Sequence, residues 1–202
     1  MYELIETNAP NPESRVPHIT NEVQRHIDLE PPGMLHHYTS QHGLLGIVST
    51  GEIWATSVNN LNDRKEFEYA KEMAESLISS RIKEESDEQK KKHLGYLHKA
   101  AANAGINICV CSWSSRADDL SQWRGYNGTG TGYSIDLKGS TLREFAEAQD
   151  FILAACIYKK STQERILGSL IDAALAQNIE QERLNPPKDD VERFLLEENG
   201  GS

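Results

Sequence analysis

Two short blocks of polar and aromatic residues hold most of the side chains that could do chemistry in this sequence. The first block reads Leu-His-His-Tyr-Thr-Ser at residues 35–40, and the second reads Leu-Ser-Gln-Trp-Arg-Gly-Tyr at residues 120–126. Because neighbouring residues of a strand point to opposite faces, at most one of the two histidines can serve a given site. We expect His37 to donate a hydrogen bond to a ligand at the strand end, with Thr39 beside it. The alternative is a half-buried strand histidine next to a helix cap.

The second block combines a guanidinium, an amide, a hydroxyl and two aromatic rings. Arg124 can bind a phosphate or a carboxylate through two parallel hydrogen bonds, and Trp123 or Tyr126 can stack on a planar ring. Gln122 can read the polar edges of a ligand, and Ser121 supplies the hydroxyl. The alternative is structural, with an aspartate capping the turn, the tryptophan in the core and the arginine paired with an acid.

A third motif, at residues 61–67, places Asn62, Asp63 and Glu66 directly before an apolar helical run. An aspartate followed three residues later by a glutamate is typical of a capping box, and both acids favour the positive end of a helix dipole. A carboxylate at a helix start can also orient a ligand or a catalytic side chain. Asp63 and Glu66 are therefore candidate catalytic carboxylates, and both explanations stay open.

Several familiar motifs are missing from the sequence. The glycines between residues 125 and 132 precede a predicted strand, whereas those of a dinucleotide-binding fingerprint follow a strand and open a helix. The sequence holds no Walker A motif, no Gly-x-Ser-x-Gly elbow and no His-Glu-x-x-His helix. We expect no metal site, because no carboxylate lies at ligand spacing near the histidines of the first block.

The elements that must position these blocks alternate between strands and helices. Apolar runs bounded by glycine or turn residues predict strands at residues 34–38, 53–58, 106–113, 132–137 and 151–158. Apolar residues at helical spacing predict helices at residues 40–51, 67–82, 94–101, 120–126, 141–149 and 161–184, with a last short helix after the prolines at 186 and 187.

This pattern predicts an α+β fold in which a mixed, mainly antiparallel sheet is flanked by helices. Residues 1–33 hold five prolines among polar residues. They are expected to form an extended N-terminal arm outside the core, with one helical turn at residues 21–27. Residues 34–198 are expected to form a single domain, which is either complete or truncated at its C-terminal end.

Composition narrows the class of protein. The net charge of -10 argues against broad binding to nucleic-acid phosphates, although a nucleic acid held locally stays compatible with it. The chain has no apolar run long enough to span a membrane, and residues 1–16 lack the features of a secretory signal. A cytoplasmic location is therefore expected. The three cysteines are odd in number, which suits reduced thiols better than a disulfide framework.

Together, the His-Tyr-Thr-Ser motif at residues 37–40, the Leu-Asn-Asp motif with Glu66, and the Ser-Gln-Trp-Arg-Gly-Tyr string closely resemble a bacterial and phage-borne domain-of-unknown-function family. The resemblance covers about residues 33–160. More distantly, the chain is similar to ADP-ribosyltransferase-like proteins, in which a strand histidine followed by a hydroxyl residue opens the pocket for the dinucleotide NAD. This similarity implies an ADP-ribosyltransferase-like fold, with His37 bonded to the nicotinamide-side ribose, Thr39 at the amide and Arg124 at the pyrophosphate.

The same similarity implies cleavage of the glycosidic bond of NAD and transfer of ADP-ribose to a protein or nucleic-acid acceptor, as in a toxin or a phage-defence effector. The catalytic residues would be His37, Arg124 and either Asp63 or Glu66. The other motif residues would line the NAD site: Tyr38, Thr39, Asn62, Ser121, Gln122, Trp123 and Tyr126.

The chain departs from the family's pattern in one respect, because a later glutamate-rich segment ending in Trp-Arg is absent. The residues at 180–183 are a poor substitute, since they continue a helical period. Two alternatives therefore stand beside the transferase. One is a catalytically silent nucleotide-sensing or protein-interaction module. The other is a metal-free hydrolase or nuclease that uses Asp63, Glu66 and His37.

Overall fold

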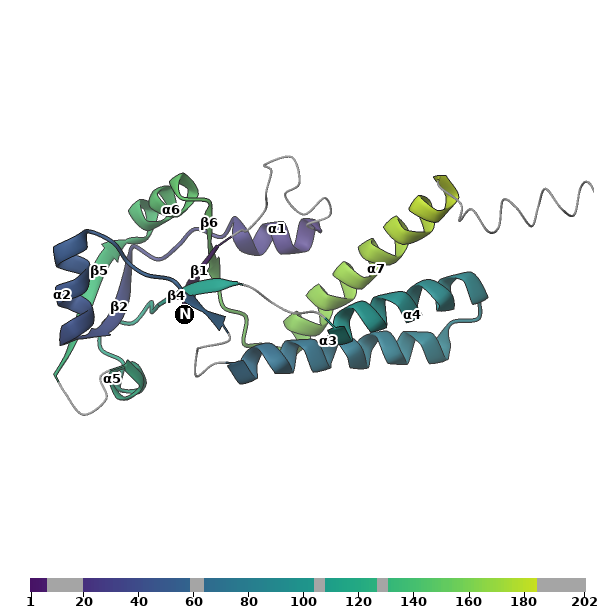
Figure 1. Cartoon of the computed structure of the whole chain (residues 1–202), viewed down its shortest axis with the longest axis horizontal. Helices are drawn as coiled ribbons and strands as arrows, with labels where there is room; N and C mark the ends of the chain where they lie inside the picture. Colours follow the sequence, from purple (N-terminus) through teal and green to yellow (C-terminus); the bar gives the residue numbers. More distant parts are fainter. Residues whose placement is uncertain (7–19, 59–63, 104–107, 127–130, 185–202) are drawn as a thin grey trace, which may run out of the picture. The chain divides into compact units, whose positions relative to one another are not determined.

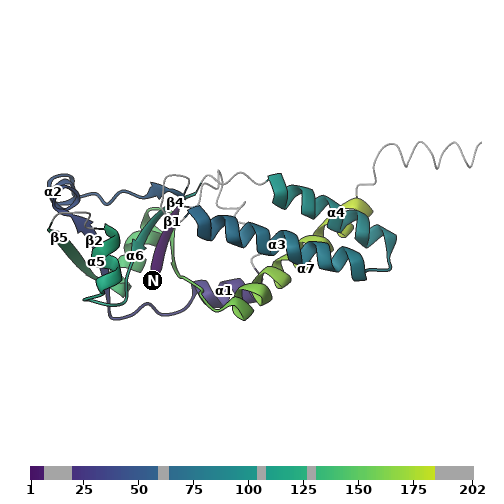
Figure 2. The same cartoon turned by 90° about the horizontal axis from the view of Figure 1, so that it is seen from below.

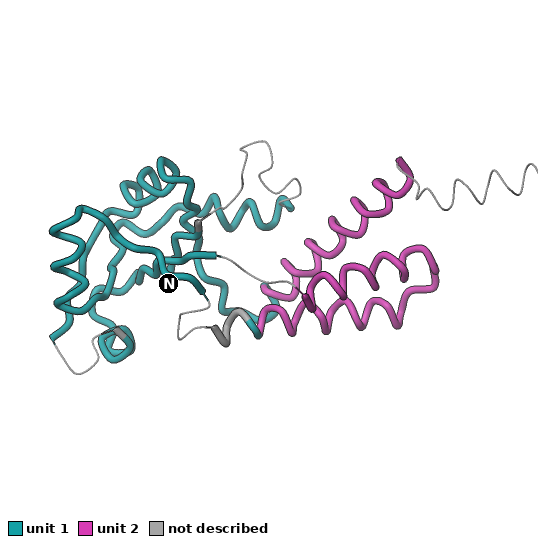
Figure 3. Tube along the Cα trace, in the orientation of Figure 1, with its two compact units in different colours: residues 1–68, 105–162 teal, residues 69–104, 163–202 magenta. Residues whose placement is uncertain are grey.

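The computed structural model describes residues 1–6, 20–58, 64–103, 108–126 and 131–184, and for residues 64–67 and 126 it describes the backbone alone. The chain divides into two compact units, which Figure 3 colours separately. Unit 1 consists of residues 1–68 and 105–162, and unit 2 consists of residues 69–104 and 163–202. The single domain expected over residues 34–198 stays a prediction, because each unit is described by itself.

Unit 1 is built on antiparallel strand pairs. Four strands form one sheet in the order β3 (Thr56–Ser57), β4 (Cys109–Trp113), β1 (Tyr2–Glu6) and β6 (Phe151–Ala155). A second sheet pairs β2 (Met34–Ser40) with β5 (Gly132–Lys138), and a single bridge joins His36 of β2 to Ser114, just after β4. The predicted α+β class with a mainly antiparallel sheet is confirmed.

Four helices complete unit 1: α1 (Asn21–Ile27), α2 (Gln41–Thr50), α5 (Leu120–Tyr126) and α6 (Gly139–Ala148). Figure 1 and Figure 2 both show α2 beside β2 and β5, in agreement with the contacts between these elements. The core of unit 1 joins both sheets to α6. Its buried members are Leu4, Leu35, Cys111, Trp113, Leu142, Ala146 and Leu153.

Unit 2 is helical. It is carried by α3 (Arg64–Glu84), α4 (Glu88–Asn103) and α7 (Lys160–Leu184). Apolar side chains of all three helices form a separate core around Ile78, Leu94 and Ile171. Across this unit, the Arg81 guanidinium of α3 donates hydrogen bonds to the Asp172 carboxylate and to the Gly168 carbonyl of α7. The predicted helices at residues 67–82, 94–101 and 161–184 are thus confirmed, each with slightly different ends.

The expectation that residues 1–33 lie outside the core is wrong for β1. This strand lies between β4 and β6, and its Leu4 side chain is only 5% exposed. Five residues with two acids carry too weak a local pattern to predict a strand, and β1 gains its stability from partners more than 100 residues away in sequence. The helical turn expected at residues 21–27 is confirmed as α1.

Three predicted strands differ in extent from those observed. The strand expected at 53–58 is reduced to Thr56–Ser57, and the one expected at 151–158 ends at Ala155. The strand expected at 106–113 is described from Cys109, and β4 has strand neighbours on both sides, as its apolar run predicted. The short helix predicted after residue 187 lies outside the described residues.

Candidate functional site

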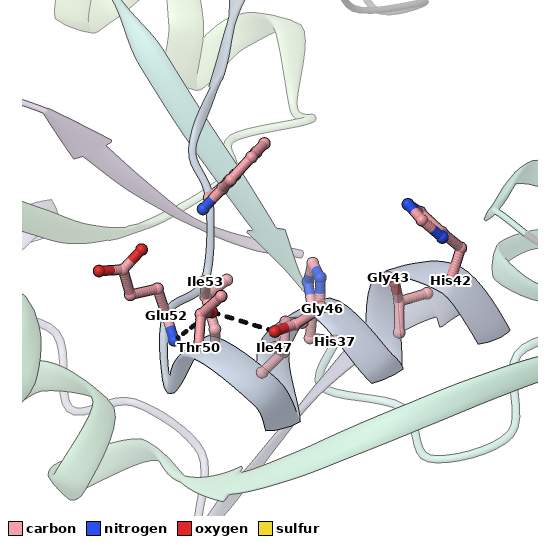
Figure 4. Close-up of a pocket in the computed structure, with 10 residues that line it drawn as sticks. His37, His42, Gly43, Gly46, Ile47, Thr50, Glu52 and Ile53 are labelled. Carbon is pink, nitrogen blue, oxygen red and sulfur yellow. Dashed lines mark hydrogen bonds between the residues drawn. The ribbon is translucent and has the colours of Figure 1, made fainter.

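A pocket of about 240 Å³ lies along α2 in unit 1 (Figure 4). The helix contributes one stripe to it, because positions three and four residues apart share a helix face. That stripe consists of Gly43, Gly46, Ile47 and Thr50, with His42 at its start. The rest of the lining comes from β2 before the helix and from residues 52–54 after it. The described lining of the pocket therefore comes from one continuous stretch of sequence.

The strand side of the pocket is formed by His37 and Thr39. They are two residues apart on β2, so both side chains point to the same face of the strand. The residues on either side of His37, His36 and Tyr38, point to the opposite face and are buried there. The prediction that only one of the two histidines can serve a given site is consistent with this arrangement, and that histidine is His37.

The orientation of the His37 ring is set by the backbone of β4. Its Nδ1 atom lies 3.0 Å from the Ser112 carbonyl oxygen, which can only accept, so Nδ1 carries the hydrogen of this bond. Burial lowers the pKa of His37 below its ordinary value of 6.5, and the bond to Ser112 opposes only part of that effect. His37 is therefore neutral at pH 7, with Nε2 as a hydrogen-bond acceptor. The expected donation from His37 to a ligand stays a prediction; in this tautomer the other ring nitrogen, Nε2, would accept instead.

The placement of α2 against β2 depends on its ends and on one close approach. The Ser40 side chain accepts a hydrogen bond from the Gly43 amide and caps the start of the helix, and Gly51 ends it with a positive φ of 71°. A Cβ atom on Gly43 would lie 2.1 Å from Thr39 Oγ1. A side chain at this position would force the Thr39 hydroxyl or the helix to move.

Residues after α2 form the far end of the pocket, and sequence reasoning missed them. The Glu52 amide donates to Thr50 Oγ1, which itself donates to the Gly46 carbonyl. Figure 4 shows the Glu52 carboxylate at one end of the pocket and the His42 ring at the other. Trp54 also lines the pocket although 79% of its surface is exposed. The sequence feature that could have indicated this part of the pocket is a tryptophan three residues after the glycine that ends the helix.

The other face of β2 anchors the second polar block. The Tyr38 hydroxyl donates to the Arg116 carbonyl at 2.8 Å and accepts from the Asp119 amide at 3.2 Å. The Tyr38 ring also meets the Trp123 ring edge to face, with 4.6 Å between centroids. Tyr38 is only 3% exposed and lies on the face of β2 opposite His37. These contacts hold α5 and the loop before it against unit 1's core strand.

At the start of α5, polar side chains form hydrogen bonds with the two aspartates that precede the helix. Asp119 accepts hydrogen bonds from both the amide and the hydroxyl of Ser121, and these bonds lower the pKa of Asp119. The Trp123 indole donates to Asp118 at 2.8 Å. The structural alternative for this block had Asp118 as the cap and Trp123 in the core; in the structure Asp119 accepts the capping bonds, whereas Asp118 is the partner of the half-buried Trp123 indole.

The predicted site residues are therefore only partly brought together. His37 and Thr39 line the pocket along α2, whereas its described lining does not include Gln122 or the exposed Arg124. Asn62 and Asp63 lie outside the described residues. The backbone of Glu66 and Tyr126 is described, but their side chains are not.

Among the described residues, no group of three or more histidine, cysteine or carboxylate side chains is placed to hold a metal ion. In the same part of the chain, no helix is long and apolar enough to cross a membrane. No disulfide joins Cys109, Cys111 or Cys156 in the part of the chain that the structure describes, and burial raises the pKa of Cys111 to about 12, which makes it a poor nucleophile.

The fold and pocket define an α+β protein with antiparallel sheets and a small strand-helix pocket. Comparison with protein families matches residues 122–192 to the family described as protein of unknown function (DUF2971). The expected resemblance to a domain-of-unknown-function family, over about residues 33–160, is thus shown only in part: the match overlaps it at residues 122–160 and continues through α7, whereas the His-Tyr-Thr-Ser and Leu-Asn-Asp motifs lie before the match. The comparisons with curated proteins and with solved structures found no match.

Proposed function

We propose that the pocket along α2 binds one end of NAD and that the protein is ADP-ribosyltransferase-like. One observation carries the proposal: His37 and Thr39, two residues apart on β2, line the same pocket, and the helix that completes it follows directly. A strand histidine followed by a hydroxyl residue and a short helix is the arrangement that the resemblance implies for the NAD pocket.

The chemistry of the lining supports this ligand. Neutral His37 offers Nε2 as an acceptor, which suits a ribose hydroxyl, and the Thr39 hydroxyl can bond an amide. Trp54 offers an exposed aromatic face for a planar ring. Ligand pockets usually measure about 300–1,000 Å³, so a pocket of about 240 Å³ would take one ring and its ribose while the rest of the dinucleotide lies outside.

In the proposed reaction, the bond between the ribose C1′ and the nicotinamide nitrogen breaks, and its electron pair leaves with nicotinamide. The ribosyl cation is then attacked by a nucleophile of a protein or nucleic-acid acceptor, which loses a proton. A carboxylate near C1′ would stabilise the cation. Asp63 or Glu66 remains proposed for this role.

A second candidate function is nucleotide recognition without chemistry. Figure 4 favours it in one respect, because the Glu52 carboxylate points away from His37 and lies at the end of α2. A pocket that binds a nucleotide but places no carboxylate beside the glycosidic bond would sense the nucleotide and leave it intact.

The test is calorimetric titration of NAD into the intact protein, followed by an assay for released nicotinamide. We expect His37→Ala to abolish binding, and Glu66→Gln to keep binding while abolishing release. Arg124→Ala tests whether α5 reaches the pyrophosphate, since Arg124 is exposed and can be replaced without disturbing the core. Binding without release would favour the recognition module. No binding at millimolar NAD would overturn both the transferase and an NAD-sensing role.

A further inference from the structure

Gly46 lines the pocket, and neither the packing nor the backbone conformation of the protein requires a glycine at this position. It lies in the middle of α2, where glycine weakens a helix relative to alanine. Apart from its two chain neighbours and the nearby backbone of α2 itself, no atom of the described residues lies within 4 Å of the position that a Cβ on Gly46 would take. Its backbone does not have the positive φ that requires glycine, unlike that of Gly51. An alanine would therefore fit the fold at this position.

Gly43 provides the contrast on the same helix face. A Cβ there would lie 2.1 Å from Thr39 Oγ1, so the packing of α2 on β2 explains that glycine. Gly46 is exposed and lines the pocket together with His37 and Trp54. A methyl group at Gly46 would thus meet no neighbouring side chain and would take up space that a ligand in this pocket could fill.

We propose that Gly46 is a specificity-determining residue, which keeps the helix backbone bare so that a flat aromatic ring of the ligand can lie against it. His37 Nε2 would accept a hydrogen bond from the same ligand, and Trp54 would add an aromatic face at the pocket's edge. The inference rests on the proposed function for the identity of the ring, which is the nicotinamide or the adenine of NAD.

The experiment compares Gly46→Ala with Gly95→Ala in the intact protein. Gly95 lies inside α4 of unit 2, and a Cβ there also meets no described atom within 4 Å, so it controls for helix propensity. Each protein is titrated with NAD, nicotinamide and adenosine, and its melting temperature is measured. A methyl group forced into a filled site weakens binding at least about tenfold. We expect this loss for Gly46→Ala alone, with a melting temperature about 2–4 °C higher in both variants.

Each other outcome has a defined meaning. Equal NAD affinity in wild type and Gly46→Ala overturns the inference and leaves the proposed function standing. A fall in the melting temperature of Gly46→Ala also overturns it, because the fold itself would then require the glycine. If NAD does not bind but nicotinamide or adenosine binds in a Gly46-dependent way, the inference stands and the proposed function fails. If none of the three binds wild type at millimolar concentration, both are overturned.

Discussion

His37 is the side chain whose environment most constrains the pocket. Its pKa is lowered by burial, so the unfolded chain takes up a proton near pH 6.5 while the folded protein does so only at lower pH. The stability that depends on neutral His37 is therefore fully present above pH 6.5. It is lost as the pH falls from 6.5 through the folded pKa. Acid thus weakens both the fold and the acceptor role of Nε2.

We expect wild type to lose more stability between about pH 7.5 and about pH 5 than His37→Asn. Asparagine keeps an N–H group for the Ser112 carbonyl but does not titrate in this range. Urea unfolding at both pH values measures the difference, and the remaining histidines cancel in the comparison. Parallel pH dependence in the two proteins would show that His37 is not buried in its neutral form.

At the scale of elements, the contact between α2 and β2 predicts that alanine lowers the free energy of unfolding at one glycine of the helix and not at another. Gly43→Ala places a methyl group against Thr39 Oγ1 and should cost about 1–3 kcal/mol of unfolding free energy. Gly46→Ala in the same helix should not lower the free energy of unfolding. Adding Thr39→Ala to Gly43→Ala removes the clashing oxygen and should restore part of the loss. Denaturant unfolding measures all three, and an unchanged stability of Gly43→Ala would mean that α2 can shift freely on β2.

The attachment of α5 to β2 can be tested through one hydroxyl. Tyr38→Phe leaves the Arg116 carbonyl and the Asp119 amide without their bonds to the buried hydroxyl, which should cost about 1–3 kcal/mol. Tyr96→Phe is the matched control, because Tyr96 is 51% exposed. Chemical denaturation followed by fluorescence reports the change, since the Trp123 ring packs against Tyr38. Equal stability of the two variants would show that the Tyr38 hydroxyl does not hold α5 against β2.

Local pattern was enough to predict most elements but not the complete site. The cap at Ser40, the stop at Gly51 and the apolar spacing between them are local signals, so α2 was predictable. The strand β1 was not, because its pairing partners are far away in sequence. His37 and Thr39 were found from strand alternation and a known motif. Trp54 was missed, because only the fold shows that this exposed ring borders a pocket.

For the whole molecule, the two separate hydrophobic cores predict that unit 1 and unit 2 unfold in separate transitions. All three tryptophans lie in unit 1, whereas unit 2 is helical. Leu94→Ala removes a 1% exposed side chain from the unit 2 core and should cost about 2–5 kcal/mol there. We expect it to lower the thermal midpoint of helix loss in circular dichroism while the tryptophan fluorescence midpoint stays in place.

Leu142→Ala is the complementary variant, because Leu142 is fully buried in the core of unit 1. It should lower the fluorescence midpoint and leave a later helical transition. If either variant moved both signals together, the two units would unfold as one cooperative body. The division into two units was not predicted, because an amphipathic helix pattern does not say against which partner its apolar face packs.

The central position of β1 also has a consequence for how the protein is made. The ribosome releases β1 long before its neighbours, since it pairs with residues 110–113 and 151–155. The four-stranded sheet cannot close until residue 155 has emerged. The Ser112 carbonyl that holds His37 belongs to β4 of that sheet. A nascent chain that already contains every described residue lining the pocket therefore still lacks the support that fixes its histidine, and the pocket takes its final form only late in synthesis.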